Sequence, residues 1–170
     1  MSARRHDPER RQRIIAAALD VIALHGVAGC THRSVAAHAD VPLGSMTYHF
    51  ASREQLVDEA FGLLAARMMQ RWQAQLADAQ DAGQLLDALV EWVCAQDGSD
   101  AQTLVPMMEL YVHAARHPQA RQLISDWMAQ VQAVLLRHFD AATARALDAV
   151  IEGITLHYIF SGGAIARAQV

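Results

Sequence analysis

The sequence predicts an all-α protein, because apolar residues recur at helical spacing and residues that break helices are scarce. The chain has 170 residues, of which 53% are apolar, and it contains only 9 Gly and 4 Pro. An all-β protein of this length needs many more turns. The sequence contains no convincing strand pattern, internal repeat or low-complexity tract. We therefore expect three short helices and about five longer ones around a sizeable core.

Capping and turn residues mark the first helices. Asp7-Pro8-Glu9 is a typical helix start, and Gly26 is a typical stop. Thr31 caps a short helix that runs to about residue 39. Asp40, which tolerates the left-handed conformation, begins the break before a second short helix at Leu43–Phe50.

Apolar stripes predict the longer helices. Ser52, with Gln55 three residues later, forms a capping box at the start of the first of them. The stripes then predict helices over about residues 53–79, 85–97, 103–117, 123–139 and 143–161.

The charge is unevenly distributed along the chain. The net charge of −4 is weakly unfavourable for a nucleic-acid partner. Residues 1–56 nevertheless carry seven Arg and five acids, a net of +2, whereas residues 57–170 carry seven Arg and thirteen acids, a net of −6. This asymmetry indicates that the N-terminal third meets a polyanion.

Other features argue against secreted and membrane classes. Cys30 and Cys94 match no metal-binding spacing and are expected to be reduced thiols. Residues 1–13 do not read as a secretory signal, and the uncharged run at 153–166 is too short to span a bilayer. We expect a cytoplasmic protein with no membrane partner.

The segment Thr31–Phe50, THRSVAAHADVPLGSMTYHF, has the pattern of a helix, a tight turn and a second helix. Small residues at 36 and 39 let the two helices cross closely. The second helix projects side chains suited to base edges and phosphates in a major groove. Helix N-termini at Thr31 and Ser52 direct free N–H groups at phosphates, and Arg33 and Arg53 add charge beside them.

Residues 9–61 resemble the DNA-binding domain of the TetR (tetracycline-repressor-like) family of bacterial transcription regulators. The matching segments are RRQRIIAAALDVIALHGVAGCT, VAAHADVPLGSMTYHF and SREQLVDEAF. The resemblance implies a helix-turn-helix DNA-binding domain at residues 1–52 and a helical ligand-binding and dimerisation domain at 53–170. The sequence departs from the family where Asp40 replaces the usual Gly and Thr47 replaces the usual Tyr.

The resemblance also implies which residues contact double-stranded DNA. Arg33 is expected on a phosphate or a base edge, Gly44 allows close approach, and Tyr48 and His49 hold phosphates. Thr47 is expected to read either a base or a phosphate. The full predicted set is Thr31, Arg33, Ser34, Leu43, Gly44, Ser45, Thr47, Tyr48, His49 and Arg53. Arg4 and Arg5 either reach a minor groove or form a solvated tail.

The last predicted helix is apolar on two sides, which predicts partners on two sides. One stripe contains Leu147, Val150, Ile151, Ile154 and Tyr158, and the other contains Ala149, Gly153, Leu156 and Phe160. Such a surface suits a two-fold homodimer. The alternative is a helix at the centre of a monomeric core.

Met and Trp residues on the core faces of the middle helices predict a pocket for a small, mostly apolar or aromatic molecule. The set is Met68, Trp72, Trp92, Met107, Tyr111 and Trp127, and the alternative for each is ordinary core packing. His157 lies either in this pocket or at the dimer interface.

Catalytic and metal sites are not indicated. Glu109, His113 and His117 share one helix face, but a solvated polar face is favoured over a metal site. There is no nucleophile–base arrangement, phosphate-binding loop or close carboxylate pair. We expect no enzyme activity, metal or cofactor.

The sequence thus predicts a homodimeric transcription regulator that binds a palindromic operator and is released by a small-molecule effector. A repressor is favoured over an activator. One alternative is a DNA-bound scaffold of the same fold that recruits a protein and has no effector. A second is a helical enzyme or metal-binding protein that has lost DNA binding.

Overall fold

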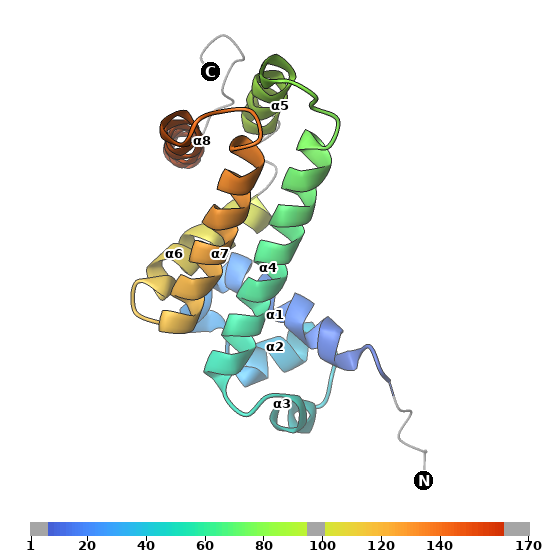
Figure 1. The fold of residues 1–170 in the computed structure, drawn as a ribbon. Helices are drawn as coiled ribbons and strands as arrows, with labels where there is room; N and C mark the ends of the chain where they lie inside the picture. The colour runs from blue at the N-terminus through green and yellow to red at the C-terminus, as the bar shows by residue number, and fades with distance from the viewer. Residues whose placement is uncertain (1–6, 95–100, 162–170) are drawn as a thin grey trace.

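The computed structural model describes residues 7–94 and 101–161, except for the side chains of residues 101, 102, 158, 159 and 161. Arg4, Arg5 and the side chain of Tyr158 lie outside this description. The described residues form eight helices and no strands (Figure 1). The helices are α1 (Arg10–Gly29), α2 (His32–His38), α3 (Leu43–His49), α4 (Arg53–Leu76), α5 (Ala82–Cys94), α6 (Ala101–Ala114), α7 (Pro118–Leu135) and α8 (Ala141–Ser161).

Helices α1 to α3 and the first half of α4 share one apolar core with α6 and the start of α7, toward the end of the molecule that carries the N-terminus (Figure 1). Ile14 and Ile22 of α1, Val35 of α2 and Met46 of α3 are fully buried there. Phe50, directly after α3, is buried in the same core. The predicted helix-turn-helix is therefore present, and burial of these side chains fixes the angle between α2 and α3.

The turn between α2 and α3 depends on Asp40. Its φ is +50°, in the left-handed region that we expected for this position. At the other end of α2, Thr31 Oγ1 accepts a hydrogen bond from the Ser34 amide at 3.1 Å, and Ser34 Oγ accepts one from the Thr31 amide at 2.9 Å. This reciprocal capping box fixes where α2 begins.

Gly26 interrupts α1 and does not end it, contrary to the sequence-based expectation. Its φ of +66° kinks the helix, and one further turn runs to Gly29. The guanidinium of Arg53 satisfies carbonyls exposed after this kink. Its Nε donates to the Cys30 carbonyl at 2.8 Å, and a terminal nitrogen donates to the Val27 carbonyl.

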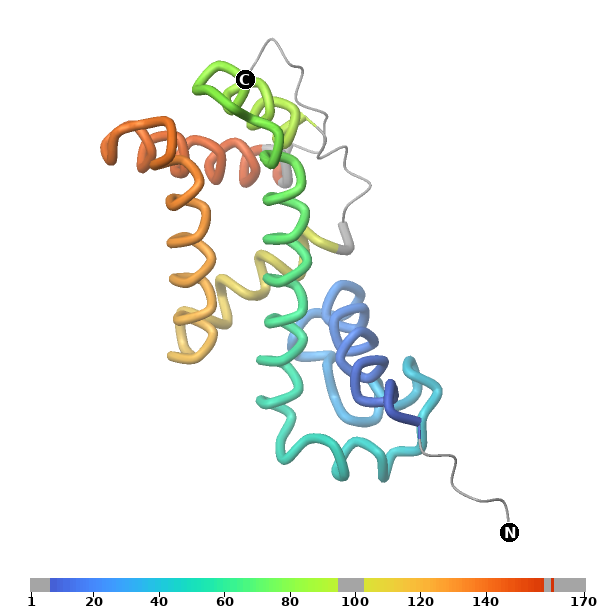
Figure 2. Tube along the Cα trace, turned by 45° about the vertical axis from the view of Figure 1, so that its right-hand side comes forward, coloured from blue at the N-terminus to red at the C-terminus, as the bar shows by residue number. Residues whose placement is uncertain are grey.

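Helix α4 joins two cores. Residues Leu56 to Leu64 belong to the first core, and Met69, Trp72 and Leu76 belong to a second core shared with α5, α7 and α8. Figure 2 shows α7 running alongside the upper half of α4, with α8 crossing near their ends. The expected domain boundary at residues 52 and 53 coincides with the start of α4, whose first half still packs with α1 to α3.

In the described part of the chain, α1 is the one helix whose length and hydropathy would allow it to cross a membrane. Seven of its residues are buried in the first core, which is the pattern of a core helix.

The positive φ of Asp40 leads to a stability prediction. The left-handed conformation raises the free energy of any residue with a Cβ. The rise is smaller for Asp than for most residues, because its side chain can hydrogen-bond locally. We expect Asp40→Ala to lower the free energy of unfolding by about 1 kcal/mol and Asp40→Gly to leave it within about 0.5 kcal/mol. Urea denaturation followed by circular dichroism measures both.

Ala37→Gly is the matched control, because Ala37 is exposed and lies within α2. Glycine should cost about 1 kcal/mol there. An equal loss in Asp40→Gly and Ala37→Gly would contradict the role assigned to Asp40.

Candidate functional site

Helix α3 presents most of its predicted DNA-contacting side chains to solvent. Tyr48 is 83% exposed and Leu43 is 51% exposed, although both are large and Leu43 is apolar. Thr47 is exposed. A Cβ atom placed on Gly44 would have no atom of the described structure outside its own backbone surroundings within 4 Å. The open surface at Gly44 leaves room for another molecule to approach the α3 backbone closely.

The Tyr48 and His49 rings lie edge to face at the end of α3. Their centroids are 4.8 Å apart with an interplanar angle of 85°. His49 is half-buried between Tyr48 and Phe50. Ser45 is also half-buried, and its amide donates to the Pro42 carbonyl at 2.8 Å, so it helps to begin the helix.

The arginines of this domain differ in how they are engaged. Arg11 is paired with Glu59 at 2.6 Å and lies over the Phe50 ring, and Arg13 is paired with Asp7 at 2.6 Å. Arg53 donates to backbone carbonyls. Arg33 is exposed on α2 and has no ion pair or hydrogen bond with any residue that the structure describes.

Three predicted contact residues therefore have structural roles. Thr31 and Ser34 cap the start of α2, and Arg53 binds carbonyls at the end of α1. The exposed members of the set are Thr31, Arg33, Leu43, Gly44, Thr47 and Tyr48. A role on DNA remains a prediction for the whole set. The carbonyl partners of Arg53 lie 23 and 26 residues away in the sequence, so no local pattern indicated them.

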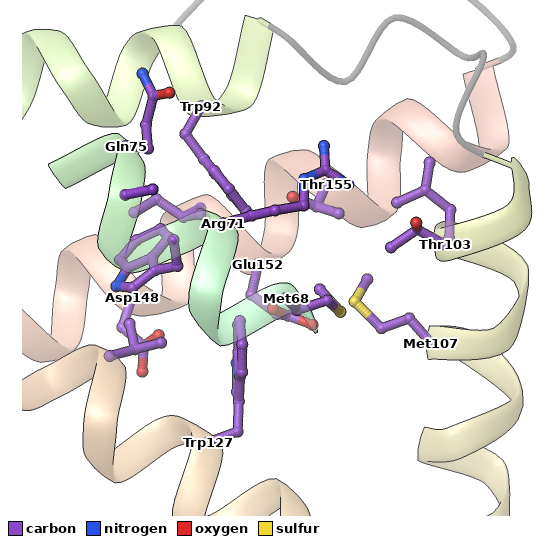
Figure 3. Close-up of a pocket in the computed structure, with 15 residues that line it drawn as sticks. Met68, Arg71, Gln75, Trp92, Thr103, Met107, Trp127, Asp148, Glu152 and Thr155 are labelled. Carbon is purple, nitrogen blue, oxygen red and sulfur yellow. The ribbon is translucent and has the colours of Figure 1, made fainter. Parts of the chain in front are cut away.

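A cavity of about 350 Å³ lies between α4, α6, α7 and α8, with α5 closing one side (Figure 3). Five of the six residues predicted for a pocket line it: Met68, Trp72, Trp92, Met107 and Trp127. The sixth, Tyr111, lies beside a smaller void that shares Met68, Met107 and Trp127 with the cavity wall. Residues from helices far apart in the sequence thus meet at one partly open cavity.

The polar wall of this cavity was missed by the sequence analysis. Asp148, Glu152 and Thr155 of α8 line it, as do Arg71 of α4 and Thr103 of α6. Asp148, Glu152 and Thr155 are spaced by four and three residues, and this spacing places all three on one face of an otherwise apolar helix. From this spacing the polar wall of the cavity could have been predicted. Figure 3 shows Arg71 directed toward Thr155.

The hydroxyl of Tyr111, on α6, donates a hydrogen bond to the Glu152 carboxylate of α8. Burial raises the pKa of Glu152 above its ordinary value, and the neighbouring Asp148 carboxylate adds to this, while the bond from Tyr111 opposes it. Burial and the Glu152 charge raise the pKa of Tyr111 as well, so its hydroxyl keeps the proton that it donates.

The indole of Trp72 is 2% exposed, and its Nε1–H has no acceptor among the described residues. A buried donor of this kind is costly unless it is satisfied. Trp72 packs edge to face on Trp92, with ring centroids 5.3 Å apart.

The polar face of α6 contacts the helix-turn-helix domain, so the expectation that it is solvated was wrong. Glu109 Oε2 accepts a hydrogen bond from the Val27 amide at 3.2 Å, just after the Gly26 kink. His113 is 9% exposed and lies 3.2 Å from Asp58 of α4, and its ring stacks on that of His117 at 3.7 Å. Polar residues on one helix face can pair across a domain contact as readily as they can meet water.

Exposed apolar side chains occur on α7 and α8. Met128 of α7 is 46% exposed and Leu136, directly after α7, is 50% exposed, while Val150 and Phe160 of α8 are 55% and 80% exposed. His157 is exposed and does not line the cavity, which leaves the dimer interface as its predicted location.

Among the described residues, no three His, Cys, Asp or Glu side chains are grouped so as to hold a metal ion. Cys30 is fully buried, and burial raises the pKa of its thiol to about 11 although Arg53 opposes this. The thiol therefore stays protonated and packs as an apolar group.

Two family models match the chain. Residues 14–60 match the bacterial regulatory proteins of the tetR family, and residues 80–170 match the tetracyclin repressor-like C-terminal domain. Together they cover the helix-turn-helix and most of the second core.

Known proteins agree with these matches. The chain is 25% identical over 162 residues to the HTH-type nicotine-responsive transcriptional repressor HdnoR of Paenarthrobacter nicotinovorans, covering 88% of this chain and 84% of HdnoR. The solved regulator SCO7518 of Streptomyces coelicolor A3(2) is 43% identical over 95% of this chain and 93% of its own, with a TM-score of 0.86.

The multidrug binding protein EbrR, solved in complex with ethidium, is 40% identical over 96% of this chain and 94% of its own, with a TM-score of 0.74. These relatives are regulators or ligand-binding proteins of one fold, and none is described as an enzyme. The chain belongs to the TetR family of bacterial transcription regulators, which bind DNA through the helix-turn-helix.

Proposed function

We propose that this protein is an effector-responsive repressor that binds a palindromic operator as a homodimer in the cytoplasm. The observation that carries the proposal is the double role of α6. Thr103, Leu104 and Met107 of α6 line the cavity, while Glu109 and His113 of the same helix contact α1 and α4. A molecule that moves α6 on entering the cavity must disturb the contact with the helix-turn-helix domain.

The dimer is supported by the exposed apolar side chains of α7 and α8. Val150 and Phe160 lie on a helix that already packs Leu147 and Ile151 against the second core, so a second apolar side of α8 is left exposed. A Cβ at Gly153 would meet nothing within 4 Å, which leaves room for close approach of a second helix. Two copies related by a two-fold axis would cover both surfaces.

In such a dimer each α3 enters a major groove, with half-sites one helical turn or a multiple of it apart, roughly 34–36 Å per turn. An effector would favour a dimer geometry in which the two α3 helices no longer match this spacing. HdnoR is described as nicotine-responsive, and EbrR has been solved with ethidium, proflavin and malachite green. These relatives support a small-molecule site in the cavity rather than an effector-free scaffold.

Operator binding is tested with Arg33 and Tyr48. We expect Arg33→Ala and Tyr48→Ala each to weaken binding to the promoter of the protein's own gene by about tenfold, because each removes a phosphate or base contact worth about 1–3 kcal/mol. Fluorescence anisotropy measures the affinity, and size-exclusion chromatography checks that the dimer is intact. Unchanged affinity in both variants would contradict the assignment of α2 and α3.

Two further arginines serve as controls in the same assay. Arg137→Ala, at an exposed site after α7, should leave operator affinity unchanged. Arg53→Ala should lower the free energy of unfolding by about 1–3 kcal/mol, because the carbonyls of Val27 and Cys30 lose a charged donor. A stable Arg53→Ala protein that has lost only DNA binding would instead place Arg53 on the phosphates.

Coupling between the cavity and DNA is tested at Glu109. We expect Glu109→Ala to bind the effector normally but to release the operator less, because the link from α6 to the Val27 amide is gone. The coupling should fall by about 1 kcal/mol from a typical total of 1–3 kcal/mol. Val112→Ala, on the exposed side of α6, is the matched control. Full release in Glu109→Ala would exclude this route.

A further inference from the structure

We propose that the effector is an organic cation with a flat apolar body, and that Glu152 is the residue that pairs with its charge. This inference rests on the proposed function only in taking the cavity as the effector site. It concerns which chemical class the cavity accepts, which none of the matches settles for this chain.

The ionisable groups in the cavity wall leave an excess of negative charge. Of the residues that the structure describes, Asp148 and Glu152 of α8 and Arg71 of α4 are the ionisable side chains that line it. With all three ionised, two carboxylates face one guanidinium. The Arg71 guanidinium lies over the Trp92 ring, 5.8 Å from its centroid, so part of its interaction is with an aromatic face.

The two carboxylates are not equivalent. Asp148 accepts a hydrogen bond from the Gln132 amide at 3.3 Å, on the side of α7. Glu152 receives its hydrogen bond from the neutral Tyr111 hydroxyl and lies in the middle of the view in Figure 3, between Trp127 and Arg71. Among the described residues, no cationic side chain forms an ion pair with Glu152. The desolvation of a half-buried carboxylate is unfavourable, and a ligand cation would offset it.

The rest of the wall suits a flat apolar body. Trp72, Trp92 and Trp127 come from three different helices, and Met68 and Met107 also line the cavity. Aromatic faces attract cations, and Met side chains adapt to irregular apolar shapes. The volume of about 350 Å³ is near the lower end of the usual range for ligand pockets, which indicates a molecule of a few rings.

Tyr111 connects the charge of the ligand to α6. A cation that pairs with Glu152 competes with the Tyr111 hydroxyl for the same carboxylate. Tyr111 lies two residues from Glu109, whose carboxylate binds the Val27 amide. A cation on Glu152 thus weakens the Tyr111–Glu152 hydrogen bond between α6 and α8. This bond lies close to the Glu109–Val27 hydrogen bond between α6 and α1.

The inference also predicts a dependence on pH. Arg71, Asp148 and Tyr111 are the charged or titratable groups from α4, α8 and α6 that face Glu152 or the cavity beside it. Burial raises the pKa of Glu152, so the carboxylate is protonated at the acid end and becomes ionised as the pH rises. Affinity for a permanent cation should therefore rise with pH through that range and then level off.

The test compares N-methylacridinium, a permanent cation, with acridine, which is uncharged at alkaline pH and differs by one methyl group. Binding to the full-length protein is measured by ligand fluorescence at mildly alkaline pH without DNA. We expect the cation to bind about tenfold tighter or more, and Glu152→Gln to remove that preference while acridine affinity stays within about threefold. The rise with pH should disappear in Glu152→Gln.

Glu91→Gln, an exposed change on α5, is the matched control and should keep the preference. Equal or weaker binding of the cation to the wild-type protein overturns the inference, as does a preference that survives in Glu152→Gln. If Glu152→Gln does not fold, the comparison of the two ligands on the wild-type protein still decides whether the cavity prefers a cation. A cation that binds through Glu152 without releasing the operator supports the ligand class and contradicts the proposed function.

Discussion

The structure depends on one constraint, which is that α4 must bury apolar side chains in two separate cores. At 24 residues this helix is about 36 Å long, and it packs Leu56 and Phe61 against α1 to α3 and Trp72 and Leu76 against α5, α7 and α8. A continuous helix transmits rotation and tilt, since its hydrogen-bonded ladder resists local bending. The core around α2 and α3 and the core beside the cavity are therefore joined by one helix.

Much of the fold could be predicted from the sequence because its determinants are local. The capping hydroxyl of Thr31, the left-handed Asp40 and the apolar stripes lie within a few residues of the structures that they specify. The helix-turn-helix follows from one continuous segment of about 20 residues. Five of the six predicted pocket residues meet at the cavity, because an apolar stripe identifies the inner side of a helix even when its neighbours are unknown.

The site features that were missed depend on pairing between distant parts of the chain. Arg53 was expected on phosphates, but the kink at Gly26 leaves carbonyls within its reach. Glu109 and His113 were expected in water, but α6 packs on α1 and α4. Glu152 was not predicted as a site residue, because it is an acidic residue in a largely apolar helix. In each case the side chain was read correctly as polar, and only the tertiary structure supplies its partner.

The engagement of most of the described arginines in the helix-turn-helix domain has a consequence for how the protein responds to ionic strength. Among the described residues, Arg10, Arg11, Arg13 and Arg53 are occupied by carboxylates or carbonyls, and Arg33 is an exposed guanidinium on α2. Each phosphate neutralised by a cationic side chain releases counterions, and their number sets how steeply DNA affinity falls with salt. A domain with few available cations gains little from this entropy. Its discrimination between an operator and random DNA should then vary less with the salt content of the cell than that of a strongly basic regulator.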